Sequence, residues 1–183
     1  MTKTTNYQLP KWEKTDRIQM KDFNDAMERI DAAVAAMPIV KLMDVTLTQA
    51  QTSVTLDFSN IDLTQYAELK IHIHSLGDNY KVLINNQSGS NDYRVAGSNH
   101  EYLFIGGYQD NDAHDAVLAI SGMGTRFINA IMHTGCGTSS YPVLDSASTE
   151  LYDAALTCIN INNCRSGYSL AAGSRFLVYG LKK

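Results

Sequence analysis

Several features that define other protein classes are missing from this 183-residue chain. It contains no run of about 18 or more apolar residues, so no membrane-spanning helix is predicted. Its start, MTKTTNYQLPKWEK, lacks the apolar stretch of a secretory signal, so we expect the chain to stay in the cytoplasm or to leave it only by cell lysis. The formal net charge is −4, and a nucleic-acid partner, which requires a basic surface, is not expected.

Cysteine is scarce, and its spacing indicates neither a disulfide framework nor a metal site. Cys136, Cys158 and Cys164 are odd in number and contain no CxxC pair. We interpret them as reduced, partly buried side chains, which is the usual behaviour of unbridged cysteine. A bridge between Cys158 and Cys164 across a turn is the alternative interpretation.

No catalytic residue set is recognisable. Ser139-Ser140 does not lie in the Gly-x-Ser-x-Gly motif that positions the nucleophile of many hydrolases. His133 and Cys136 are three positions apart, a spacing that is no evidence for a nucleophile and its base. We therefore predict neither an enzyme nor a cofactor.

The acidic excess lies in the larger, C-terminal part of the chain. Residues 1–41 contain seven Lys or Arg and six Asp or Glu, whereas the rest of the chain contains eight and thirteen. An acidic surface repels anionic polymers and anionic lipid headgroups. Neither nucleic acid nor a membrane is therefore predicted as a partner.

Residues 16–37, DRIQMKDFNDAMERIDAAVAAM, contain no Gly or Pro and predict a helix over 18–37, with Asp16 as a cap of its first turn. The apolar residues of this helix are 3, 4, 3, 4 and 3 positions apart, which is the heptad repeat of a coiled-coil seam. The six seam residues are Met20, Phe23, Met27, Ile30, Val34 and Met37.

Two interpretations of this apolar stripe stay open. In the first, a single amphipathic helix lies on its own β-domain. In the second, which we prefer, copies of the chain associate through the stripe around a symmetry axis. Short helices are marginally stable, so about two and a half heptads cannot hold a bundle alone, and the downstream domains would have to contribute.

After Pro38 the apolar pattern changes to the period of two that is typical of β-strands, most clearly in residues 53–59 and 68–75. About ten short strands separated by turn-forming residues indicate an antiparallel β-sandwich. A jelly roll fits best, because connections such as 108–115 and 134–150 are too long for simple hairpins. The further predicted strands are 40–47, 80–85, 92–96, 101–107, 116–121, 126–133, 155–161 and 174–181. We therefore expect a mostly β protein with two parts, an N-terminal segment and helix (1–38) and a jelly-roll-like β-sandwich (39–183).

The opening segment, YQLPKWEKTDRIQMKDFNDAMERIDAAV, resembles the N-terminus of prophage tail and baseplate proteins from Gram-positive bacteria. The C-terminal AAGSRFLVYGLKK also looks like the end of these proteins, whereas the centre matches loosely. The resemblance implies a virion component at the tail tip, commonly trimeric, with the helix docked to the assembly and the sandwich facing outward. The residues that carry it at the N-terminus are Leu9, Pro10, Trp12, Asp16, Asp22, Phe23, Asn24, Ile30 and Asp31.

His72 and His74 are two positions apart on a predicted strand and therefore project from the same face. A His-x-His pair from each of three chains could surround iron, nickel or zinc on a threefold axis. The alternation of the strand instead favours an exposed pair without metal. His72 and His74 are thus only weak metal candidates.

Two sets of residues are candidates for ligand contact. The loop 108–115 gathers Asp110, Asp112 and Asp115, whose oxygens could bind calcium or contact a glycan, although the loop lacks the glycine and terminal glutamate of an EF-hand. A solvated loop that binds no ligand is the alternative. Three tyrosines, which lie in or beside turn-rich segments, could stack on sugar rings and hydrogen-bond through their hydroxyls. Burial at strand ends is the alternative for these tyrosines. The candidate ligand-binding residues are Tyr93, Tyr108, Asp110, Asp112 and Tyr141.

The resemblance, together with the apolar stripe, implies a homotrimeric component of a bacteriophage tail tip or baseplate. Its expected partners are other tail or baseplate proteins and, as a further role, a polysaccharide of the bacterial surface. The alternative is a free-standing lectin-like carbohydrate-binding module. An enzyme that acts on cell-wall polymer is the least favoured interpretation.

Overall fold

The computed structural model divides the chain into two compact units, Met1–Pro38 and Ile39–Lys183, and each is described by itself. In the part of the chain that the structure describes, no helix has the length and apolar character needed to cross a membrane. The described residues are 2–17, 19–77, 79–89, 92–95, 98–106, 113–125, 127–136, 143–150, 155–164 and 167–183.

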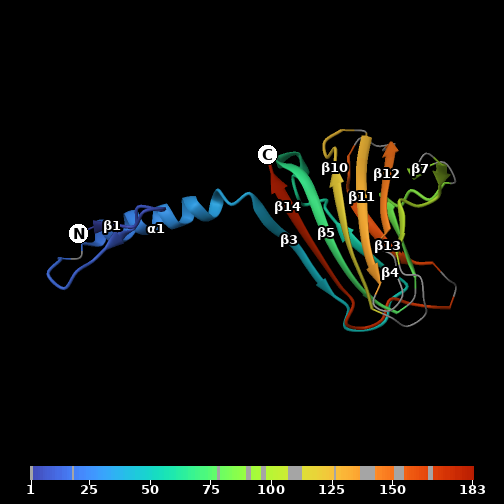
Figure 1. Cartoon of the computed structure of the whole chain (residues 1–183), viewed down its shortest axis with the longest axis horizontal. Coiled ribbons are helices and arrows are strands. Elements are labelled where there is room, and N and C mark those ends of the chain that lie inside the picture. Colours follow the sequence, from blue (N-terminus) through green and yellow to red (C-terminus); the bar gives the residue numbers. More distant parts are fainter. Residues whose placement is uncertain are drawn as a thin grey trace. The chain divides into compact units, whose positions relative to one another are not determined.

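The N-terminal unit consists of a short hairpin and one helix (Figure 1). β1 (Thr2–Lys3) pairs antiparallel with β2 (Pro10–Lys11), and α1 spans Met20–Ala35. Arg29 on the helix donates from Nη1 to the carbonyl oxygen of Gln8 at 3.2 Å, and Ala26, one turn earlier, is buried. The hairpin therefore packs on the helix face that carries Ala26 and Arg29.

The helix begins later than the sequence predicted, and Asp16 does not cap it. The Oδ2 of Asp16 accepts a hydrogen bond from the backbone N–H of Glu13 at 2.9 Å. This bond lowers the pKa of Asp16 below its ordinary value. Gln19 occupies the N-cap position with no hydrogen bond from its side chain. The cap prediction is wrong because the carboxylate of Asp16 closes a turn within the preceding segment.

The C-terminal unit is an antiparallel β-sandwich, as expected (Figure 1). Its larger sheet has eight strands in the order β3-β14-β5-β10-β11-β12-β7-β8, and its smaller sheet has the order β4-β13-β6-β9. In chain order, its elements are β3 (Ile39–Thr46), β4 (Ser53–Asp57), the 3₁₀ turn η1 (Leu63–Gln65), β5 (Tyr66–Leu76), β6 (Tyr80–Ile84), β7 (Tyr93–Val95), β8 (Ser98–His100), β9 (Phe104–Gly106), β10 (Ala113–Ser121), β11 (Phe127–Cys136), β12 (Val143–Glu150), β13 (Cys158–Asn163) and β14 (Arg175–Lys182).

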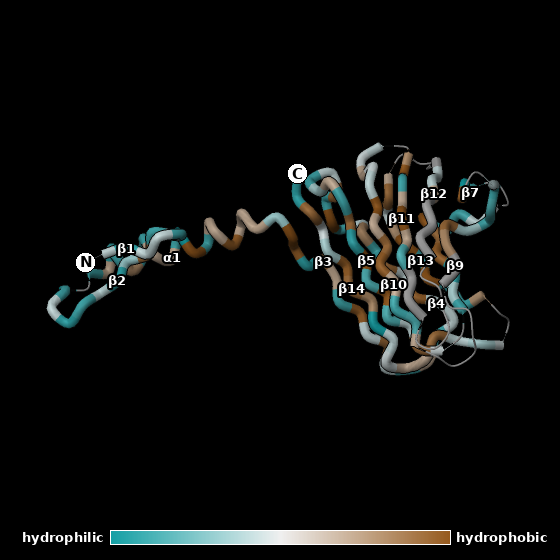
Figure 2. The backbone as a smooth tube through the Cα atoms, in the orientation of Figure 1, coloured by the Kyte–Doolittle hydropathy of each residue, from teal (hydrophilic) through white to brown (hydrophobic). Residues whose placement is uncertain are grey.

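Period-two alternation separates the core from the surface of the larger sheet, and Figure 2 shows it as alternating hydrophobic and hydrophilic segments along the strands. On β5, Leu69, Ile71 and Ile73 are buried, whereas Lys70 and His72 are exposed. The buried faces of both sheets form one hydrophobic cluster. The outer face of the larger sheet therefore carries the polar residues of its strands.

A pair of asparagines shapes the end of β6. Asn85 and Asn86 have positive φ angles of 50° and 59°, a conformation that asparagine tolerates better than most residues. The side chain of Asn85 accepts hydrogen bonds from the N–H groups of Thr157 and Cys158, at 2.8 and 3.1 Å, and donates to the carbonyl of Ala155 at 2.7 Å. This network fixes the segment before β13 against the smaller sheet.

The mostly β sandwich with one preceding helix is confirmed, but a jelly-roll connectivity is not. Each of the ten predicted strand regions contains a strand, with ends shifted by a few residues. The long connection predicted over 134–150 is wrong, because β11 extends to Cys136 and β12 occupies Val143–Glu150. The sequence of β12, VLDSASTE, is mostly polar or small and gave little apolar alternation.

Candidate functional site

The predicted seam residues are exposed along one side of α1. The exposed fractions of Met20, Phe23, Met27, Ile30, Val34 and Met37 range from 41% for Ile30 to 74% for Met20. Met37 lies just beyond the helix, where its N–H donates to the carbonyl of Val34 at 3.1 Å. The hairpin contact through Arg29 leaves this stripe open. An exposed apolar stripe of this length is typical of a surface that binds another molecule.

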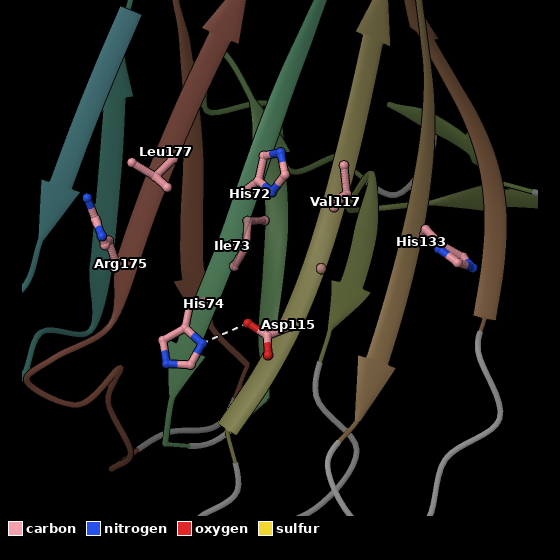
Figure 3. A pocket seen from close by; sticks show the side chains of 9 residues that line it. His72, Ile73, His74, Asp115, Val117, His133, Arg175 and Leu177 are labelled. Atoms are coloured by element: carbon pink, nitrogen blue, oxygen red, sulfur yellow. Dashed lines mark hydrogen bonds and ion pairs between the residues drawn. The ribbon is translucent and has the colours of Figure 1, made fainter. Parts of the chain in front are cut away.

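A second candidate lies on the outer face of the eight-stranded sheet. A pocket of about 390 Å³ opens there across β14, β5, β10 and β11 (Figure 3). We call it the sheet-face pocket. It is lined by His72, Ile73, His74, Asp115, Ala116, Val117, His133, Arg175 and Leu177.

Strand register explains why these residues meet. Leu177, His72, Val117 and His133 are direct cross-strand partners in one row over four adjacent strands. The neighbouring row brings Arg175 beside His74, and His74 beside Asp115. Residues directly opposite one another on adjacent strands project from the same face of the sheet. The pocket is therefore built by pairing between strands that are distant in sequence.

Short polar contacts hold the side chains around the pocket. The Nδ1 of His74 lies 2.7 Å from Oδ1 of Asp115, and Figure 3 shows the two groups facing one another. Arg175 donates two hydrogen bonds to Asp44 on β3, from Nε at 2.9 Å and from Nη2 at 2.8 Å. The imidazole of His72 stands edge-on to the ring of Tyr179, with centroids 5.6 Å apart. These contacts restrict the rotamers of pocket residues, which lowers the entropy that a ligand would have to remove.

His72 and His74, the weak metal candidates, lie close together on β5. Among the described residues, no group of three or more His, Cys, Asp or Glu side chains is placed to hold a metal ion. His72 and His74 project from the same outer face, as predicted, and His74 is directed to Asp115. The pair thus contributes to the sheet-face pocket.

Tyr93 is not available for ligand contact, and its prediction as a binding residue is wrong. Only 1% of Tyr93 is exposed. Its hydroxyl accepts a hydrogen bond from the N–H of Ile84 at 2.7 Å and donates to the carbonyl of Gln87 at 2.8 Å. Burial raises the pKa of this hydroxyl. Its ring belongs to the core, which is the alternative that the sequence left open.

The other predicted ligand residues, Tyr108, Asp110, Asp112 and Tyr141, lie outside the described residues. The predicted loop ends earlier than expected, because β10 begins at Ala113 and Asp115 lies within it.

The prediction for the cysteines is confirmed in part. Cys158 and Cys164 both carry thiols, so the alternative bridge between them is not formed, but Cys164 is exposed rather than partly buried.

The sequence indicated three of the polar pocket residues, His72, His74 and Asp115, although it placed Asp115 in a loop, and it did not indicate the roles of His133 and Arg175. His133 lies 59 positions after His74, and Arg175 lies 42 positions later again. No spacing rule connects strands so far apart when their order in the sheet is unknown. The sequence signal that could have found His133 was its position in the alternation of the predicted strand 126–133, which places it on the outer face.

Comparison with known proteins gives no family for this chain. A scan against protein-family models finds no match, and a search of curated proteins finds no significant match.

Proposed function

We propose that this chain is a self-associating subunit of a bacteriophage tail tip or baseplate. The observation that carries the proposal is the exposed heptad stripe, which runs along α1 from Met20 to Val34 and continues to Met37 just beyond the helix. Leaving six apolar side chains in water costs free energy at roughly 25 cal/mol per Å² of apolar surface. Packing the stripe against identical stripes removes that cost, and the heptad spacing suits such packing.

The arrangement of the chain supports an assembly role. A helix that carries the apolar stripe precedes a separate β-sandwich with its own core. Association through short helices would display several sandwiches together, and several weak sites on one particle raise avidity well above that of a single site. The resemblance of the N-terminal segment to prophage tail proteins adds the virion as the expected location. The partners on this proposal are copies of the chain and neighbouring tail proteins.

Immunogold electron microscopy tests the location. Antibodies against the β-sandwich are applied to purified particles released from lysed cells that carry the gene. Gold at the end of the tail distal to the capsid supports the proposal, and particles that contain no trace of the chain overturn it.

A free-standing lectin-like module is the second candidate function. The observation that favours it is the sheet-face pocket, which combines polar and apolar side chains on a solvent-facing sheet. On this alternative the chain binds saccharide but is not found in particles. The two candidate functions therefore predict different results in the same immunogold experiment.

A further inference from the structure

Small residues on β10 lie between larger side chains of both neighbouring strands. Val117 is the cross-strand partner of His72 on β5 and of His133 on β11. One row along, Ala119 lies between Lys70 and Ile131. The sheet-face pocket occupies the first of these rows, with Val117 among its lining residues. The outer surface of the sheet is therefore recessed along β10, between the larger side chains of β5 and β11.

The charges around the pocket are compensated within the protein. Arg175 is bound to Asp44 through two hydrogen bonds. Lys41 lies 3.1 Å from the same carboxylate of Asp44, so this group has one positive charge in excess, against the one negative charge of Asp115, and Lys70 lies 3.7 Å from Glu68. The site therefore presents fixed hydrogen-bonding groups with little net charge. Such a site offers no strong attraction to a phosphate or carboxylate group, and the acidic excess of the sandwich opposes one further.

The pocket also offers apolar contact. Leu177 and Val117 lie in the same row as His72 and His133, so aliphatic surface alternates with imidazole rings across the four strands. A sugar ring has the matching chemistry, since its C–H groups can pack on apolar or ring surfaces while its hydroxyls bond to polar neighbours. The volume of about 390 Å³ is within the range of roughly 300–1,000 Å³ that small-molecule sites occupy.

We propose that the sheet-face pocket binds a neutral saccharide, with Asp115, His133 and Arg175 supplying hydrogen bonds and Val117 and Leu177 supplying apolar contact. This inference rests on the proposed function, which places the sandwich at the bacterial surface. It adds the class of ligand that the sandwich binds there. It places saccharide contact on the sheet face rather than in the tyrosine-bearing loops. It also selects uncharged sugars over anionic wall polymers.

The test is a binding titration with the full chain. The probes are soluble neutral oligosaccharides of hexose, 6-deoxyhexose and N-acetylhexosamine, with a glycerol-phosphate polymer as the anionic comparison. His133→Ala removes a polar group, and Val117→Phe fills the pocket. Asn129→Ala and Ser121→Phe are the matched controls, because they change exposed residues on the same two strands outside the pocket. All four positions lie on the outer face, so the variants should fold, which circular dichroism checks.

We expect a neutral probe to bind the wild-type chain. His133→Ala and Val117→Phe should each weaken binding about tenfold or more, since losing a hydrogen bond to a polar ligand group costs about one such factor. The two controls should stay within about twofold of wild type. The inference is overturned if no neutral probe binds, if the glycerol-phosphate polymer binds better, or if pocket and control variants behave alike. A fall in oligomer mass on Val117→Phe, without any saccharide binding, would instead identify this face as a contact between copies.

The outcome is separable from that of the proposed function. Gold at the tail tip together with absent saccharide binding overturns only the present inference. Saccharide binding that the pocket variants abolish, together with particles that lack the chain, overturns only the tail-tip role.

Discussion

Arg175 on β14 holds Asp44 on β3 through two hydrogen bonds, from Nε to Oδ1 at 2.9 Å and from Nη2 to Oδ2 at 2.8 Å. Lys41 lies 3.1 Å from the same Oδ2. Arg175, with a further contribution from Lys41, lowers the pKa of Asp44 from 3.8 to about 2. Because β3 is an edge strand of the larger sheet, this pair joins the edge to its neighbour beside the sheet-face pocket.

This pair predicts a specific pH dependence. The pKa of Asp44 is lower in the folded chain, so the stabilisation is fully present above the ordinary value of 3.8 and is lost as the pH falls towards about 2. NMR titration of the Asp44 carboxyl should give a midpoint near 2. In Arg175→Gln the midpoint should move up towards 3.8. A midpoint near 3.8 in the wild-type chain would show that the ion pair is not formed in solution.

Tyr93→Phe should destabilise the sandwich. The substitution leaves the ring in place but removes the hydroxyl that bonds to the backbone of Ile84 and Gln87 in a buried site. Unsatisfied buried groups cost about 1–3 kcal/mol, and urea denaturation should show a loss of that size. Tyr168→Phe is the control, because Tyr168 is exposed and should change stability little. Equal midpoints for the two variants would contradict the buried role of Tyr93.

Gly180→Ala should also destabilise the fold, for a steric reason. A Cβ at Gly180 would overlap the ring of Tyr66, although the backbone of Gly180 is ordinary for a strand. Overpacking of this kind typically costs about 1–3 kcal/mol. In a Tyr66→Leu background the same change should cost less, because the ring is absent, and a double-mutant cycle measures the difference. Additive effects in that cycle would show that the loss of stability does not come from overlap with the ring of Tyr66.

The sequence predicted those parts of the fold whose signal is local. The alternation in residues 68–75 identified β5 and the shared face of His72 and His74, and the heptad spacing identified α1. It could not predict that β14 lies between β3 and β5, because strand order depends on long-range packing. The pocket follows from that order. The burial of Tyr93 was equally hidden, since a tyrosine beside a turn has the same local pattern whether its ring faces the core or the solvent.

The double variant Met27→Asp and Val34→Asp should dissociate the oligomer. Both residues lie on the exposed stripe of α1, and two carboxylates at a helix seam would have to be desolvated. Ala32→Asp with Ala35→Asp is the matched control, because it adds the same charge at exposed positions off the stripe. Sedimentation velocity should show a slower species for the stripe variant only. Dissociation of both variants would indicate a general effect of charge rather than a seam.

The most direct measurement is the mass of the full wild-type chain in solution by light scattering over a range of concentrations. The exposed stripe predicts a mass above that of one chain, 20.2 kDa, and the resemblance to prophage tail proteins predicts about three times that mass. A mass of 20.2 kDa at every concentration would contradict self-association through α1.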